Sequence, residues 1–185
     1  MNQQPHNEQE RQGVNFVILT GKALAACWWP FCRVNSGREA LGIHVLISIL
    51  IIIFVACAAN TDAGWIYFLC WLLACLKQKA MRKQAYKKGL IPHTRYEGFP
   101  WLAQKLFPRI KTEGNLKAAE AFLGIVLGAL LTYLEPVLGY LLIMSGIAIL
   151  INEAINVDAR KRRVSQMRDA QLEMHQLTDD FQNQF

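Results

Sequence analysis

The feature that most constrains this chain is the absence of charged side chains from four long blocks. Residues 40–61, 63–76, 121–134 and 136–152 contain no Asp, Glu, Lys or Arg. A helix rises about 1.5 Å per residue, so about 20 apolar residues cross the ~30 Å hydrocarbon core of a bilayer. The first block reaches that length by itself, and the whole chain is 53% apolar and 18% charged. These blocks predict an all-α integral membrane protein and exclude a soluble or disordered chain.

The four blocks are joined in pairs by short connections. Residues 60–64 link the first pair, and Glu135-Pro136 links the second. Pro136 suits the first turn of a helix, where the N–H that proline lacks would have had no partner. We therefore predict four transmembrane helices arranged as two hairpins, at 40–76 and 118–152. The arms of the second hairpin are short, so the alternative there is a re-entrant hairpin that dips into the membrane and returns.

The orientation of these helices follows from the basic residues. None of the 20 Lys and Arg residues lies at either hairpin tip. The central segment, 77–117, carries eleven of them against only Glu97 and Glu113. Because cytoplasmic segments of membrane proteins are enriched in Lys and Arg, we predict that both termini and the central segment face the cytoplasm, in an inner or plasma membrane.

The N-terminal region contains a different kind of apolar segment. Residues 1–13 are polar and predict a disordered tail. The apolar residues that follow are interrupted by Lys22, and a lysine at the centre of a bilayer costs about 2.5–3.5 kcal/mol. We therefore predict that 14–39 forms an interfacial amphipathic helix and a basic linker, with Trp28 and Trp29 as anchors at the membrane surface. The alternative is an additional span.

The central segment predicts a surface in contact with lipid headgroups. Its aromatic residues are interleaved with Lys and Arg, which favours attraction to an anionic leaflet. The residues expected to bind anionic lipid or another polyanion, with nucleic acid left open, are Lys83, Lys87, Lys88, Arg95, Lys105 and Arg109. Residues 93–97 also place an imidazole, a guanidinium and a carboxylate within five positions. They predict either a phosphate or headgroup site with Arg95 as bidentate donor, or a loop in which Arg95 pairs with Glu97.

Small residues lie on both arms of the second predicted hairpin. Gly124 and Gly128 form a GxxxG pair, and Gly139 and Gly146 lie seven residues apart on the other arm. Because small residues let helix backbones approach closely in lipid, the four glycines predict helix packing, either within the hairpin or between subunits.

The C-terminal segment, 153–185, contains no Gly or Pro and predicts a cytoplasmic amphipathic helix that continues the last span. Its apolar residues recur at alternating intervals of three and four and define a seam: Met167, Ala170, Met174, Leu177 and Phe181. An apolar seam that faces water needs a partner. That partner is a second copy, another protein, or this chain's own cytoplasmic segment.

No motif in the sequence indicates catalysis, a metal site or a cofactor. The predicted spans contain one histidine, His44, and no Asp, and neither Cys27 nor Cys32 has a nearby histidine to complete a zinc site. We therefore expect no cofactor and no enzyme activity. The sequence predicts a self-associating membrane scaffold or assembly subunit that recruits a cytosolic protein. The alternative is a pore built from several copies, which conductance in reconstituted bilayers would distinguish from a scaffold.

Overall fold

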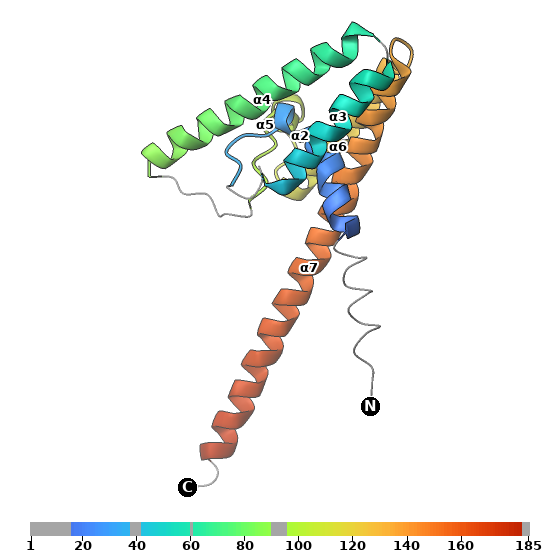
Figure 1. Cartoon of the computed structure of the whole chain (residues 1–185). Coiled ribbons are helices and arrows are strands. Elements are labelled where there is room, and N and C mark those ends of the chain that lie inside the picture. Colours follow the sequence, from blue (N-terminus) through green and yellow to red (C-terminus); the bar gives the residue numbers. More distant parts are fainter. Residues whose placement is uncertain (1–15, 38–41, 60, 90–95, 183–185) are drawn as a thin grey trace, which may run out of the picture. The chain divides into compact units, whose positions relative to one another are not determined.

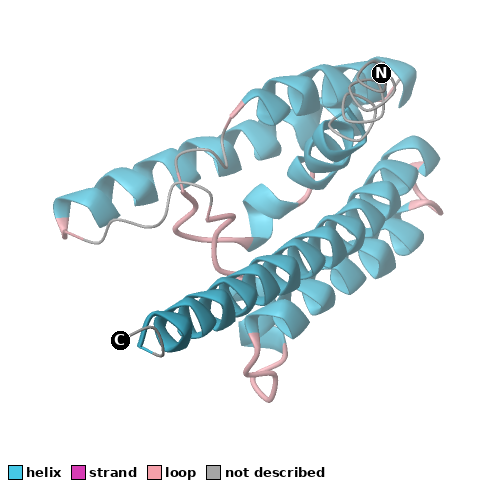
Figure 2. Cartoon of the chain, turned by 90° about the horizontal axis from the view of Figure 1, so that it is seen from below, coloured by secondary structure: helices cyan, strands magenta, loops and turns pink. Residues whose placement is uncertain are grey.

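The computed structural model describes residues 16–37, 42–59, 61–89 and 96–182. The structure is 83% helical, and the only strand-like pairing within the described ranges is an isolated antiparallel bridge between Val34 and Phe99. Figure 2 shows the helices joined by short loops. The all-α class predicted from the sequence is therefore correct, whereas the tail predicted at 1–13 lies outside the described residues.

The helices follow the order of the apolar blocks (Figure 1). The first described helix, Phe16–Ala26, is followed after a two-residue turn by α2, Trp29–Cys32. The helices at the positions of the first predicted hairpin are α3, Ile43–Ala59, and α4, Asp62–Lys87. Helix α5, Trp101–Leu106, lies in the central segment. The helices of the second predicted hairpin are α6, Glu113–Leu131, and α7, Pro136–Gln182.

Two helices continue beyond their apolar blocks. Helix α4 runs on through the basic residues to Lys87. Gly89 follows with φ +73°, a left-handed conformation that glycine adopts without a steric penalty and that ends many helices. Helix α7 continues from its apolar half into the C-terminal segment, where no Gly or Pro interrupts it. The helical character predicted for the C-terminal segment is confirmed.

Two described helices are long and apolar enough to cross a membrane by length and composition. They are Glu113–Leu131 and the part of α7 between Pro136 and Thr178. Helix α3 is equally apolar in character but has only 17 residues.

The chain divides into two compact units, residues 1–152 and 153–185. The first unit contains the two helix pairs, the N-terminal segment and the central segment. The second unit consists of the C-terminal part of α7, and its side chains from Arg160 to Thr178 are exposed wherever the helix is described. A single helix has no second element against which to bury an apolar face, so this unit has no core of its own.

The core of the first unit is built around the N-terminal segment. One part of the core gathers Trp28 and Trp29 with Leu142 of α7. The other part packs Cys27 against Ile52 of α3 and against α4 and α7. The N-terminal segment packs against both helix pairs, α3 with α4 and α6 with α7. It therefore links the two pairs through apolar contacts.

The structure corrects the prediction that Trp28 and Trp29 are anchors at the membrane surface. Trp28 and Trp29 are both buried, and Ala23 and Ala26 of the preceding helix are completely inaccessible. An indole ring brings a large apolar area that must be covered, and here other helices of the same chain cover it. The sequence could not distinguish these cases, because one apolar helix face suits a lipid surface and a protein core equally well.

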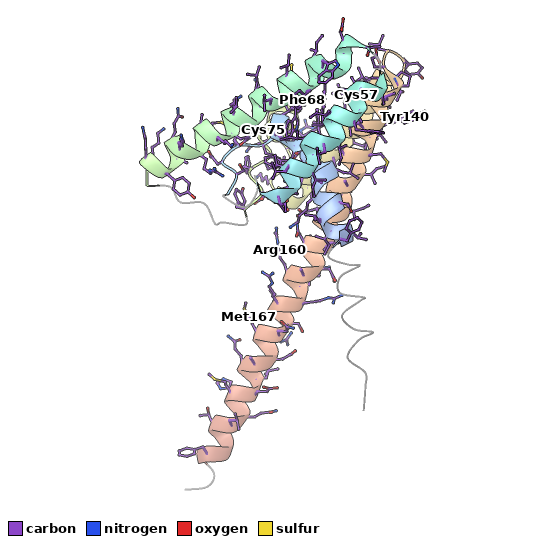
Figure 3. The ribbon with its side chains drawn as sticks, viewed as in Figure 1. Cys57, Phe68, Cys75, Tyr140, Arg160 and Met167 are labelled. Carbon is purple, nitrogen blue, oxygen red and sulfur yellow. The ribbon has the colours of Figure 1, made fainter. Side chains whose placement is uncertain are left out.

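All five cysteines are free thiols in the structure. Cys27, Cys32 and Cys75 are buried, whereas Cys57 and Cys70 are exposed. Figure 3 shows Cys57 on α3 and Cys75 on α4.

Candidate functional site

The most unusual site in the first unit is a buried group of charges around Arg33. Arg33 is only 4% exposed, and Glu120 of α6 is fully buried. The Nε of Arg33 donates to both carboxylate oxygens of Glu120, at 3.0 and 2.9 Å. An Nη of Arg33 also donates to Glu97 at 3.2 Å, and Glu97 is partly exposed. One guanidinium therefore joins the N-terminal segment to α6 and to the loop that precedes α5.

The two carboxylates keep this buried guanidinium charged. Burial alone lowers the pKa of Arg33, but attraction to Glu120 and Glu97 and the hydrogen bonds to them raise it, and the pKa lies above its ordinary value. A second buried cation lies one turn before Glu120 on α6. Lys117 is 3.3 Å from the carboxylate of Glu113, four residues earlier on the same helix.

A tight backbone contact brings Glu97 to Arg33. The N–H groups of Val34 and Phe99 each donate to the carbonyl oxygen of the other residue, at 2.9 and 2.8 Å. Gly98 lies between Glu97 and Phe99 with φ +93°, and a Cβ added there would stand 3.0 Å from the carbonyl oxygen of Val34. The φ of Gly98 is one that L side chains rarely adopt, so another residue would be strained there, and its Cβ would also crowd the carbonyl oxygen of Val34.

Gln78 of α4 and Trp28 of the N-terminal segment complete the site. The Nε2 of Gln78 donates to the carbonyl oxygens of Pro30, at 3.2 Å, and Arg33. The indole N–H of Trp28 donates to the backbone oxygen of Glu120 at 3.3 Å. Gln78 and Glu120 thus hold the end of α2 from two helices that belong to different pairs.

This arrangement is suited to holding the first unit together. The carboxylates of Glu120 and Glu97 are both occupied by Arg33. Within the described ranges, no group of three or more His, Cys, Asp or Glu side chains is placed to hold a metal ion. We therefore interpret the Arg33 site as a buried electrostatic clamp.

The predicted anion-binding residues lie on two separate parts of the central segment. Lys83, Lys87 and Lys88 are exposed at the end of α4, and Lys105 and Arg109 are exposed in and after α5. Arg95, together with His93 and Thr94, lies outside the described residues. Glu97, which the sequence could pair with Arg95, forms an ion pair with Arg33.

The four predicted packing glycines all contact their own chain. A Cβ on Gly128 would lie 2.8 Å from the backbone oxygen of Gly139, and one on Gly146 would lie 2.7 Å from that of Ala121. A Cβ on Gly124 would lie 2.9 Å from the indole nitrogen of Trp28. Gly128, Gly139 and Gly146 therefore pack within the second hairpin, whereas Gly124 packs against the N-terminal segment.

The residues of the predicted seam are exposed on the second unit. Met167, Met174, Leu177 and Phe181 are 65%, 70%, 69% and 64% exposed. Figure 3 shows Arg160 and Met167 projecting from this part of α7. The periodicity predicted from the sequence therefore gives an accessible apolar stripe along one side of the helix.

Sequence reasoning did not identify the clamp. Arg33 lies in the predicted basic linker, and Glu120 directly precedes the charge-free block 121–134. The available signal was that each is an isolated charge at the edge of an apolar stretch, where an ionisable residue needs a partner. The residues that would pair could not be inferred, because Arg33 and Glu120 are 87 residues apart in the chain.

Comparisons with protein-family models, with curated proteins and with solved structures found no match for this chain. The functional interpretation therefore rests on the residues and their geometry.

The exposed lysines allow the predicted lipid surface to be tested. Replacing Lys87, Lys88 and Arg95 together with Gln should weaken retention of the detergent-solubilised protein on phosphatidylserine-coated beads. Each basic residue near an anionic surface contributes about 1 kcal/mol. Retention of the unmodified protein should also fall as salt is added, because salt screens exposed charges. Equal retention of variant and unmodified protein at low salt would mean that these residues serve only to orient the spans.

Proposed function

We propose that this chain is a four-span membrane scaffold whose C-terminal helix recruits and joins other proteins at the cytoplasmic face. Support for the membrane placement comes from large apolar side chains that face outward on all four long helices. Examples are Phe54 of α3, Leu73 of α4, Leu130 of α6 and Tyr140 of α7, all well exposed. Soluble monomers rarely expose contiguous apolar patches larger than a few hundred Å².

The exposed face of α4 supports the proposed position of the membrane boundary. Leu73 and Leu76 are exposed, and the exposed residues that follow them include Lys77, Lys79 and Lys83. An outward face that changes from apolar to basic along one helix is typical of a helix that leaves the hydrocarbon core on the cytoplasmic side. The same rule favours cytoplasmic termini.

The observation that carries the scaffold proposal is the exposed seam. Four of its five side chains are bulky and apolar, and each is more than three-fifths exposed. Burying such a side chain against a partner contributes roughly 1.5–3 kcal/mol. A helix that keeps this stripe in water without a core of its own is suited to pairing with another helix.

A double substitution in the seam tests this proposal. Replacing Met174 and Leu177 with Asp should convert a multi-copy species into a smaller one when mass is measured by light scattering in mild detergent. Leu172→Asp is the matched control, because Leu172 is exposed on the same helix but lies outside the seam. It should leave the mass unchanged.

The same experiment separates self-association from recruitment. If the seam binds a different protein, the copy number should stay constant while that protein ceases to co-purify with the double variant and still co-purifies with Leu172→Asp. Unchanged mass together with unchanged co-purification would contradict the scaffold proposal.

A further inference from the structure

The N-terminal segment, Phe16–Cys32, is a broken helix whose free backbone oxygens are bonded by side chains of its neighbours. The helix ends at Ala26, and of its last carbonyl oxygens those of Leu24 and Ala25 accept from the N–H groups of Cys27 and Trp28 in the turn, each at 3.1 Å, whereas those of Ala23 and Ala26 accept from other helices. The hydroxyl of Ser48 lies 2.7 Å from the oxygen of Ala23 and 2.8 Å from that of His44, so these two oxygens share its single hydrogen. The indole N–H of Trp71 donates to the oxygen of Ala26 at 2.9 Å.

The turn that follows the break is bonded in the same way. The hydroxyl of Tyr67 donates to the oxygen of Cys27 at 2.7 Å, and Gln78 donates to the oxygen of Pro30. A segment at the membrane surface could leave such groups to water. In hydrocarbon no water is available, and non-helical backbone is tolerated only where protein satisfies it. The donors from α3 and α4 therefore satisfy backbone oxygens that would have no partner in hydrocarbon.

Contacts along α4 show that the segment returns toward the side from which α4 leaves. Cys27 is bonded by Tyr67, whereas Arg33 is bonded by Gln78, eleven residues further along α4. The two donors are about 16 Å apart along α4, whereas the four residues of α2 between Cys27 and Arg33 rise only about 6 Å, so the long side chains of Tyr67 and Gln78 cover part of that distance. Gln78 lies in the basic stretch of α4, so Arg33 lies at its cytoplasmic end in the proposed orientation.

Contacts along α7 show that the segment also enters from that side. A Cβ on Gly21 would lie 3.2 Å from the side-chain oxygen of Asn152, at the end of the apolar half of α7. The thiol of Cys27 lies beside the hydroxyl of Ser145, seven residues before Asn152 on α7. The segment therefore goes inward between Gly21 and Cys27 by about 9 Å, the rise of six helical residues.

From these contacts we propose that Phe16–Cys32 is a re-entrant loop that enters the membrane from the cytoplasmic side, turns at Cys27 and Trp28, and leaves on the same side. In Figure 1 the segment, in blue, lies among the helices of the first unit. The inference rests on the membrane placement proposed above and is independent of the C-terminal seam. The re-entrant path also explains why a lysine is tolerated in this apolar stretch. Lys22 follows Gly21 and therefore lies near the entry point, away from the bilayer centre.

A labelling experiment on the full chain tests the path of the loop. Single cysteines at positions 12 and 38, in a background without other cysteines, should react with a membrane-impermeant maleimide only in inside-out vesicles. A cysteine at position 135, at the tip of the second hairpin, should react only in right-side-out vesicles. Labelling of positions 12 and 38 from opposite faces would show a complete span and overturn the proposal. Failure of position 135 to label from outside would count against the four-span placement instead.

A second measurement tests whether the hydrogen bonds from α4 keep Cys27 enclosed, as the re-entrant loop requires. With Cys27 as the only cysteine, its reaction with N-ethylmaleimide in vesicles should be slow. Removing two donors, by Tyr67→Phe with Trp71→Phe, should accelerate the reaction by roughly tenfold or more, because two buried acceptors lose their partners and local opening becomes easier.

The matched control removes one tyrosine hydroxyl and one tryptophan indole at exposed positions. Trp65→Phe with Tyr140→Phe should leave the rate of Cys27 labelling unchanged, since both residues are exposed. Rapid labelling of Cys27 in the otherwise unmodified chain would place the segment at the surface and overturn the proposal. The labelling of positions 12 and 38 is done with Tyr67 and Trp71 unchanged, so it still tests the loop if the variant without these two donors does not fold. Neither result depends on copy number, so the scaffold proposal is tested separately.

Discussion

Replacing Glu120 with Ala is expected to destabilise the first unit by about 3–5 kcal/mol, the usual cost of leaving one member of a buried ion pair without its partner. Arg33 would remain only 4% exposed and would keep Glu97 alone as a carboxylate partner. The loss should appear as a lower midpoint of unfolding in mixed detergent micelles titrated with dodecyl sulfate. Tryptophan fluorescence should report it, because Trp28 contacts Glu120 directly.

Two further variants identify the cause of that loss. Arg33→Met combined with Glu120→Leu removes both charges while keeping apolar volume, and it should recover much of the stability lost by Glu120→Ala. Arg162→Gln is the surface control. Arg162 is 2.9 Å from Asp158, but both are exposed, and such pairs contribute about 0–1 kcal/mol. A loss after Arg162→Gln as large as that after Glu120→Ala would contradict the clamp.

Replacing Gly128 with Leu should have the second large effect, a loss of about 1–3 kcal/mol or more through overpacking. An added Cβ would lie 2.8 Å from the backbone oxygen of Gly139 and equally close to the backbone nitrogen of Ile143. Backbone atoms cannot turn aside as a flexible side chain can, so α6 and α7 would have to separate. The unfolding midpoint in the same detergent titration measures this loss.

Ala129→Leu is the matched control, because Ala129 is the next residue on α6 and is exposed. It should change the midpoint little. Since Gly128 contacts the chain's own α7, the copy number of Gly128→Leu should equal that of the unmodified protein under conditions where both remain folded. A lower copy number with an unchanged midpoint would instead place Gly128 between subunits.

The course of the helices could be predicted from local sequence. Charge-free blocks, the short connections between them and the absence of Gly and Pro after residue 152 predicted where α3, α4, α6 and α7 would form. The seam of the second unit was also predictable, because side chains three and four residues apart lie on one face of a helix. These features depend on neighbours within a few residues, and such information is present in the sequence itself.

Only the tertiary structure decided the place of the N-terminal segment and the partners of the buried charges. An apolar stretch interrupted by Lys22 can be covered by lipid or by other helices, and the burial of Trp28 and Trp29 shows that helices of the same chain cover these two side chains. The pairing of Arg33 with Glu120 links positions 87 residues apart. The glycines likewise predicted close packing but could not specify against which helix. Composition and periodicity describe what a residue needs, such as an apolar cover or an opposite charge, whereas the chain segment that meets the need is determined by how distant elements pack together.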